Sequence, residues 1–134
     1  MYTSEVKIRV RYSETDRMGY VYHGNYAEYF EVARVETLRN LGMNYKDMED
    51  GGIMLPVYTI NVTFLKPAFY DDMLTIKSTI KEIPKARITF HHEIYNEKDE
   101  LLSTGEVTVV FIDMKSNKPM GAPENFLNKF RKYF

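Results

Sequence analysis

Hydrophobic and charged residues alternate strictly near the start of the chain. Over residues 5–12, Val6, Ile8, Val10 and Tyr12 share one face, and Glu5, Lys7, Arg9 and Arg11 share the other. A period of two with β-branched residues predicts a half-buried strand. The alternation stops at Ser13, and a polar turn containing Gly19 follows.

The spacing changes to that of a helix after this turn. Asn25 suits an N-cap, and Glu28 three residues later completes a capping-box pattern. A helix is therefore predicted over 26–41, and Gly42 supplies its C-terminal stop. Its apolar stripe is wide enough for burial on more than one face, and comprises Tyr26, Tyr29, Phe30, Val32, Ala33, Val35, Thr37, Leu38 and Leu41.

The remainder of the chain is rich in strand-forming residues. We predict a short helix over 44–49, a tail helix over 123–132 that packs Phe126, Leu127 and Phe130, and long strands over 53–65, 72–83, 86–97 and 101–113. Short loops between consecutive strands favour an antiparallel sheet. One apolar helix against such a sheet predicts a two-layer α+β fold in a single domain, residues 1–134.

Composition removes several functional classes. The chain has 134 residues and a formal net charge of −1, so no basic field points to nucleic acid. No apolar run has the length of a membrane span, and the strand-like N-terminus does not resemble a signal peptide. A cytoplasmic location is therefore expected. With no cysteine there is no disulfide, thiolate metal site or cysteine nucleophile.

The candidate chemistry lies between the first strand and the long helix. Asp16 stands in the turn, where an aspartate often bonds its own backbone. It also precedes a helix N-terminus, whose unpaired N–H groups can stabilise an oxyanion while a carboxylate attacks or activates water. Glu14 is the competing carboxylate, either solvated or the true base. His23 is either a surface residue or a donor through its backbone N–H.

Two further groups of residues have a structural and a functional interpretation. His91 and His92 are adjacent in a predicted strand, so they should point to opposite faces and cannot easily bind one ion. No metal site is therefore predicted. Lys81, Lys85 and Arg87 surround a turn between strands, either as a solvated edge or as a binding region for a phosphorylated ligand. Nucleophile-elbow, Walker, Rossmann and RNA-binding sheet motifs are absent from the sequence.

The segment from Tyr12 to Tyr26, YSETDRMGYVYHGNY, resembles the 4-hydroxybenzoyl-CoA thioesterase family and, within it, the YbgC-like acyl-CoA thioesterase branch. A second block from Phe64, FLKPAFYDDMLTI, supports the same resemblance. The resemblance implies a hotdog fold, in which a curved antiparallel sheet wraps a long central helix. It also implies homodimers or homotetramers with active sites between subunits. No cofactor is implied.

The resemblance also assigns site residues. Asp16 matches the catalytic carboxylate, the backbone N–H of His23 matches the group that polarises the thioester carbonyl, and Tyr22 matches a neighbouring aromatic position. The substrate-binding residues implied are Gly19, Gly24, Asn25, Lys85 and Arg87, the last two toward the nucleotide of CoA. Arg17 and Met18 depart from the small residues often found after the aspartate, which bears on the shape of the acyl pocket.

Hydrolysis of an acyl-CoA thioester is the function that these residues favour. The alternative is a module that binds acyl-CoA or acyl-carrier-protein thioesters without cleaving them. A hotdog dehydratase or hydratase is a weaker alternative, because that chemistry needs a base aimed at the carbon chain, often a histidine. His23 is the only histidine near the motif, and the aspartate precedes it. The identity of the acyl group cannot be read from the sequence.

Overall fold

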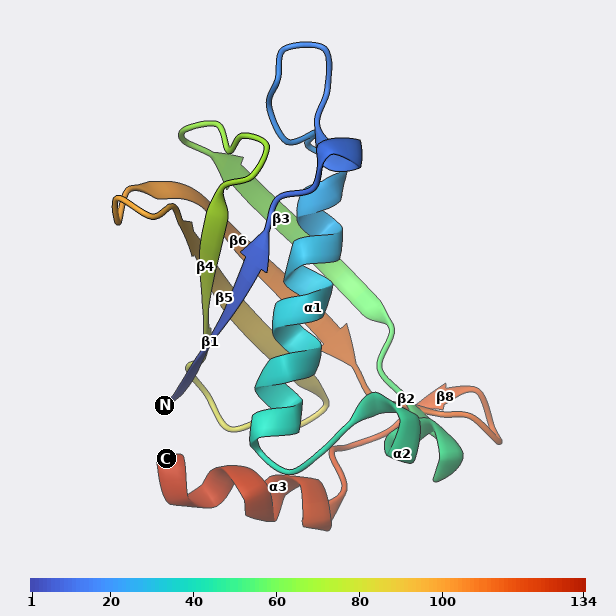
Figure 1. Ribbon diagram of the computed structural model, residues 1–134. Helices are drawn as coiled ribbons and strands as arrows, with labels where there is room; N and C mark the ends of the chain where they lie inside the picture. The colour runs from blue at the N-terminus through green and yellow to red at the C-terminus, as the bar shows by residue number, and fades with distance from the viewer.

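A five-stranded antiparallel sheet with one long helix across its inner face organises the molecule (Figure 1). The computed structural model describes residues 1–134. The strand order is β1-β4-β5-β6-β3, with β1 Tyr2–Arg9, β3 Val57–Phe64, β4 Met73–Ile80, β5 Arg87–Tyr95 and β6 Leu101–Val110. The helix α1 spans Asn25–Asn40 and packs mainly against β1 and β4. The predicted α+β class is confirmed.

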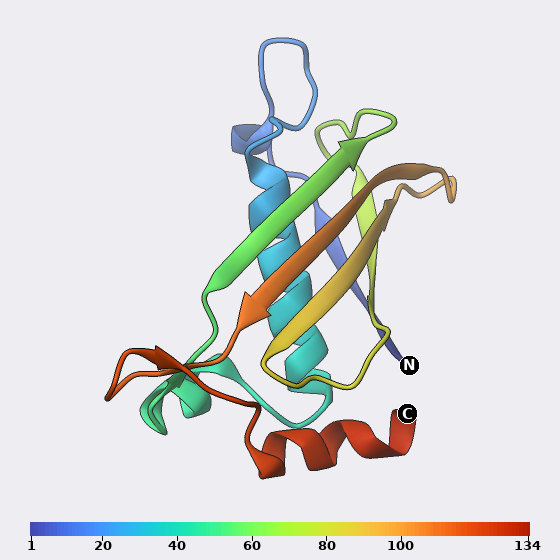
Figure 2. The same cartoon turned by 180° about the vertical axis from the view of Figure 1, so that it is seen from behind.

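Smaller elements gather at one end of the sheet, and the chain between η1 and α1 projects at the other (Figures 1 and 2). The short helix η1 covers Tyr12–Glu14. The elements at the far end are α2 (Tyr45–Asp50), α3 (Glu124–Phe130), η2 (Arg131–Tyr133) and a three-stranded sheet of β2 (Ile53–Met54), β7 (Ile112–Asp113) and β8 (Lys118–Pro119). None of the helices has the length and apolar character needed to cross a bilayer.

Three predicted strands differ from the observed ones. The first ends at Arg9, because the chain then turns into η1, and this leaves Tyr12 76% exposed instead of on the buried face. The predicted strand 53–65 is divided at Pro56, which has no N–H for the ladder. The predicted strand 101–113 is divided at Phe111, whose N–H donates to the carbonyl of Ala86 instead of to a neighbouring strand.

The helix start also differs from the prediction. Gly24 is the N-cap of α1, and Asn25 is the first helical residue, so the predicted capping box is wrong. The Asn25 side-chain amide donates to the carbonyl of Glu14 at 2.7 Å. A long-range partner therefore replaces the local capping bond.

A side chain of α1 packs tightly against the backbone of β6. Gly105 of β6 lies directly under the Phe30 ring, and a Cβ at Gly105 would overlap that ring. Phe30 in turn stacks on the imidazole of His92 in β5, with ring centroids 4.8 Å apart and planes 6° apart. The missing side chain at Gly105 thus sets how near the helix comes to the sheet.

His92 is a buried polar group within this core. Its Nδ1 lies 2.7 Å from the Ser78 hydroxyl, while its Nε2 is buried without a partner. Burial, with smaller contributions from the charges of Arg34 and His91, lowers the pKa of His92 to about 3. The ring is therefore neutral in the folded protein at ordinary pH.

Replacing Gly105 with alanine tests the approach of the helix to the sheet. We expect Gly105→Ala to lower the free energy of unfolding by about 1–3 kcal/mol, because Phe30 must move out of its position over the sheet. Urea denaturation measures this change. Gly121→Ala is the matched control, since a Cβ there meets no atom within 4 Å. Equal stability of the two variants would contradict this account of the packing.

His92 predicts a pH dependence of stability. Its folded pKa of about 3 lies below the ordinary value of 6.5, so the unfolded chain binds the extra proton first. Stability from this group is present above pH 6.5 and is lost as pH falls toward 3, by at most about 1.4 kcal/mol per pH unit. Urea denaturation at a series of pH values between 7 and 4 gives the free energy of unfolding as a function of pH. This free energy should fall less steeply with decreasing pH for His92→Phe than for the wild type. Parallel slopes for this variant and the wild type would refute the assignment.

Candidate active site

The chain between η1 and α1 is a tight loop that Asp16 organises. The Asp16 N–H donates to the carbonyl of Tyr20 at 2.8 Å, and the Gly19 N–H donates to the carbonyl of Asp16 at 3.0 Å. Gly19 has φ +81°, a conformation that residues with a Cβ rarely adopt. The predicted role of Gly19 in shaping this loop therefore has a conformational cause.

The two carboxylate oxygens of Asp16 have different surroundings. Oδ1 accepts the N–H groups of Met18 at 2.9 Å and Tyr20 at 3.2 Å, as in an Asx turn. Oδ2 has no hydrogen-bond partner in the chain. The side chain is half-buried. The turn interpretation and the chemical interpretation of Asp16 are thus compatible, since one oxygen holds the turn and the other is available.

The loop packs against the segment after β3 and encloses a cleft. The Val21 N–H donates to the carbonyl of Ala68 at 2.8 Å, and the rings of Tyr20 and Phe69 meet edge to face at 5.5 Å. The cleft has a volume of about 300 Å³ and a mainly apolar lining: Asp16, Met18, Tyr20, Val21, His23, Tyr26, Phe64, Leu65, Lys66 and Pro67. Asp16 and His23 therefore line the same cleft.

The start of α1 supplies hydrogen-bond donors beside this cleft. The carbonyls of Tyr22 and His23 accept the N–H groups of Asn25 and Tyr26 at 2.9 and 3.2 Å, which continues the helical turn backwards. The N–H groups of His23 and Gly24 have no acceptor in the chain. They form the positive end of the helix dipole, where a negative charge is stabilised.

The other predicted residues of this segment lie beside the cleft. Tyr22 is about half exposed, and its ring lies against the His23 ring with 4.4 Å between the centroids. Tyr22 does not line the cleft. Gly24 gives that ring space, since a Cβ at Gly24 would come within 2.7 Å of it. Asn25 ties the first turn of the helix to Glu14.

Glu14 is neither solvated nor available as a base. The residue is 6% exposed, and its carboxylate oxygens accept hydrogen bonds from the backbone and side chain of Arg11 and from the Tyr29 hydroxyl. Burial by itself would raise the pKa of Glu14, but these hydrogen bonds outweigh it and hold the pKa below its ordinary value. Burial and the bond to Glu14 raise the pKa of Tyr29, so its hydroxyl stays a donor.

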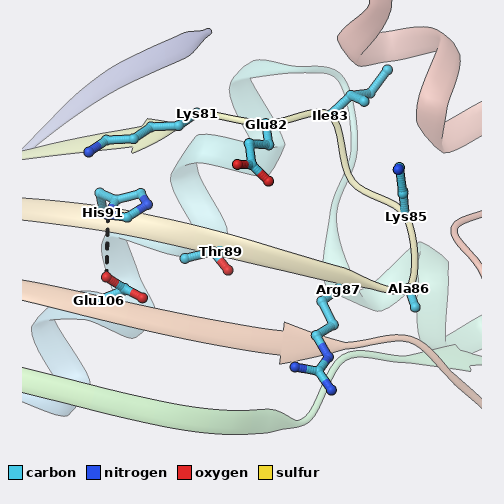
Figure 3. A pocket seen from close by; sticks show the side chains of 9 residues that line it. All are labelled: Lys81, Glu82, Ile83, Lys85, Ala86, Arg87, Thr89, His91 and Glu106. Carbon is cyan, nitrogen blue, oxygen red and sulfur yellow. Dashed lines mark ion pairs between the residues drawn. The ribbon is translucent and has the colours of Figure 1, made fainter.

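Lys85 and Arg87 do not join Asp16 within one chain. Arg87 pairs with Val110 at the end of the sheet where β3 begins, whereas the cleft lies where β3 ends at Phe64. Eight strand residues separate these ends by roughly 23 Å. A separate open cavity of about 650 Å³ lies at the Arg87 end, and the side chains of Lys81, Lys85 and Arg87 point in different directions around it (Figure 3).

Neither histidine of β5 belongs to a metal site. His92 faces the core. His91 faces outward, where its Nδ1 lies 3.7 Å from Glu106 (Figure 3). The two rings therefore point to opposite faces, as predicted. No group of three or more His, Cys, Asp or Glu side chains is arranged to hold an ion.

Sequence reasoning missed most of the apolar wall of the cleft. Phe64, Leu65 and Lys66 belong to the second block of the resemblance, but no role was assigned to them there. The signal was available, because this block begins at the last residue of β3 and contains Pro67. Lys66 also forms an ion pair with Glu100 at 2.7 Å, and this pair keeps the positively charged Lys66 ammonium group at the edge of the cleft.

Comparisons with known proteins show which family this chain belongs to. Residues 10–130 match the family described as the thioesterase-like superfamily. The chain belongs to this family. It is 35% identical to a putative acyl-CoA thioesterase, YneP, of Bacillus subtilis over 100% of this chain and 91% of the relative. It is 32% identical to the acyl-CoA thioester hydrolase YbgC of Escherichia coli over 92% of each chain.

A solved structure agrees with these relatives. The DHNA-CoA thioesterase of Staphylococcus aureus superposes with a TM-score of 0.94 at 38% identity, covering 99% of this chain and 91% of that one. The predicted family, the hotdog fold and the predicted enzyme class, a thioester hydrolase, are therefore confirmed.

Proposed function

We propose that this thioesterase hydrolyses acyl-CoA with Asp16 as nucleophile or general base and the N–H of His23 as oxyanion donor. The supporting observation is that Asp16 and His23 line one apolar cleft, with an unpartnered Oδ2 on the aspartate and unpartnered N–H groups at the helix start. The thioester carbonyl would lie between them, with its oxygen toward the N–H of His23.

Two routes are compatible with this arrangement. In the first, Oδ2 of Asp16 attacks the carbonyl carbon, the C–S bond breaks, and water hydrolyses the resulting anhydride. In the second, Asp16 accepts a proton from a water molecule that attacks the same carbon. Both routes place negative charge on the carbonyl oxygen, and the loss of one donor to such an oxygen typically costs about 3 kcal/mol. The thiolate of CoA leaves in each case.

An aromatic acyl group suits the cleft. Its lining brings together the rings of Tyr20, Tyr26 and Phe64, and Phe64 meets Tyr26 edge to face at 4.9 Å. Aromatic side chains favour such contacts with another ring. The 38% identical relative from Staphylococcus aureus acts on DHNA-CoA, which supports an aryl-CoA as the first substrate to test.

The exposed edge of the sheet favours an assembly of at least two chains. Strand β3 has a neighbour only on its β6 side, and its exposed apolar side chains include Val57, Tyr58, Ile60 and Phe64. An apolar, unpaired edge is a site for pairing with another chain. We therefore propose that β3 pairs antiparallel with β3 of a second copy about a twofold axis.

This pairing would also explain how Lys85 and Arg87, which lie far from the cleft of their own chain, could serve a substrate. Arg87 lies over the Tyr58 ring at 4.6 Å, beside the start of β3. Antiparallel pairing sets the start of one β3 beside the end of the other, so the partner subunit's Arg87 would approach the end of the sheet that carries the cleft. Lys85 and Arg87 would then serve the nucleotide of a CoA bound to the other chain.

The non-catalytic alternative uses the same cleft. A module that binds acyl-CoA or acyl-carrier-protein thioesters would bind the thioester tightly without releasing thiol. The unpartnered Oδ2 of Asp16 favours the hydrolase, because binding alone does not need a carboxylate at the thioester carbon.

Replacing Asp16 with asparagine tests the assignment. The amide oxygen can still accept the N–H groups of Met18 and Tyr20, so the loop should keep its shape. We expect kcat to fall by roughly 100-fold to 10,000-fold, as for loss of a catalytic base. Release of free thiol from an aryl-CoA and from a straight-chain acyl-CoA measures the rate.

Asp99→Asn is the matched control for this experiment. Asp99 lies in an exposed turn with φ 59°, which asparagine tolerates, and this variant should keep the wild-type rate. Near wild-type hydrolysis by Asp16→Asn would eliminate the assignment. Calorimetric binding of acyl-CoA without thiol release by the wild-type protein would favour the binding module instead.

Introducing a charge into β3 tests the proposed assembly. We expect the wild-type protein to have at least twice the mass of one chain by light scattering. Ile60→Lys should reduce the mass to that of one chain and abolish hydrolysis, because a lysine at the pairing edge opposes strand addition. Thr3→Lys, on the opposite edge strand, is the control. A monomeric and active wild-type protein would contradict the model of a shared site.

A further inference from the structure

Glu14 has a complete set of hydrogen bonds within a buried position. Oε1 accepts the Arg11 N–H at 2.8 Å and the Tyr29 hydroxyl at 3.0 Å. Oε2 accepts Nε and Nη2 of Arg11 at 3.3 and 3.0 Å. A carboxylate offers about four acceptor positions, so none is left for a substrate. The proposed chemistry at Asp16 makes no use of this group.

The backbone of the same residue holds the other side of the loop. The Glu14 carbonyl accepts the Tyr22 N–H at 2.8 Å and the Asn25 side-chain amide at 2.7 Å. Tyr22 directly precedes His23, and Asn25 begins α1. Glu14 therefore joins the chain that enters the loop, the chain that leaves it, and the second turn of the helix.

The two points where Glu14 holds the loop lie next to the two groups that face the cleft. Asp16 follows Glu14 by two residues, and the N–H of His23 adjoins the Tyr22 anchor. Between the two anchors, the loop is closed on itself by the pairing of Thr15 with Val21. The separation between the Asp16 carboxylate and the unpartnered N–H groups is therefore set through Glu14, which does not line the cleft itself.

We propose that Glu14 is a positioning residue whose buried carboxylate, fixed by Tyr29 and Arg11, aligns Asp16 with the N–H groups before α1. This inference rests on the proposed function of Asp16. A displacement of about 1 Å in such an alignment can reduce the rate of a reaction 100-fold. A carboxylate needed only for folding would affect stability and not the chemical step.

Removal of one hydroxyl tests this role with little disturbance of the core. Tyr29→Phe keeps the ring and deletes only the bond to Glu14. We expect kcat to fall about tenfold or more, while KM for acyl-CoA changes less than about twofold. Amide hydrogen exchange should increase in residues 15–25 and not in β4 or β5. Glu14→Gln, which places an NH₂ among donors, should show the same pattern more strongly.

Tyr95→Phe is the matched control, because the Tyr95 hydroxyl also donates to a glutamate, Glu93, at 3.1 Å, but on the exposed outer face. It should leave kcat and exchange unchanged. A wild-type kcat in Tyr29→Phe, or an equal increase of exchange in β4 and β5, would overturn the positioning role.

Asp16→Asn, measured in parallel, separates the two hypotheses. If Asp16→Asn is inactive and Tyr29→Phe is fully active, the positioning role fails and the proposed function stands. If Asp16→Asn retains its activity, the proposed function fails, and the positioning role fails with it.

Discussion

The close packing of α1 on the sheet is the constraint on which the site depends. Phe30 occupies the space that a side chain at Gly105 would take, and its ring stacks on His92. This contact fixes the height and direction of the helix over the strands. The N-terminal end of α1 is thereby directed to the end of the sheet where β3 finishes, and the loop that carries Asp16 projects at the same end (Figure 1). Packing in the core thus decides where the unpartnered N–H groups before α1 lie.

Local pattern was enough to predict the main elements of this fold. The apolar stripe placed the long helix within one residue of its observed bounds. Alternation identified the first strand of the large sheet, and strand-forming composition identified the other four. The errors have specific causes. Pro56 lacks a ladder donor, and Phe111 bonds Ala86, so two long strands are divided. Asparagine is a residue type typical of an N-cap, but the side-chain amide of Asn25 donates instead to the carbonyl of Glu14, eleven residues earlier.

The candidate site was predictable in part, and mainly through the resemblance. Spacing alone favoured a turn residue at Asp16 over a catalytic one, and the structure shows that Asp16 holds the turn with one oxygen. The role of Glu14 could not be read from the sequence, because its burial depends on Tyr29 coming from the next element. The separation of Arg87 from the cleft depends on strand order, which the alternation of residues does not encode.

The unequal surroundings of the two Asp16 oxygens have a consequence for how the acid is oriented. The carboxylate cannot rotate to exchange its oxygens without releasing the N–H groups of both Met18 and Tyr20. Within the loop, the carboxylate is therefore oriented by the loop's own peptide backbone. One oxygen fixes the orientation and the other stays free, so the loop can vary in its exposed side chains, such as Arg17, while the direction of the carboxylate is preserved.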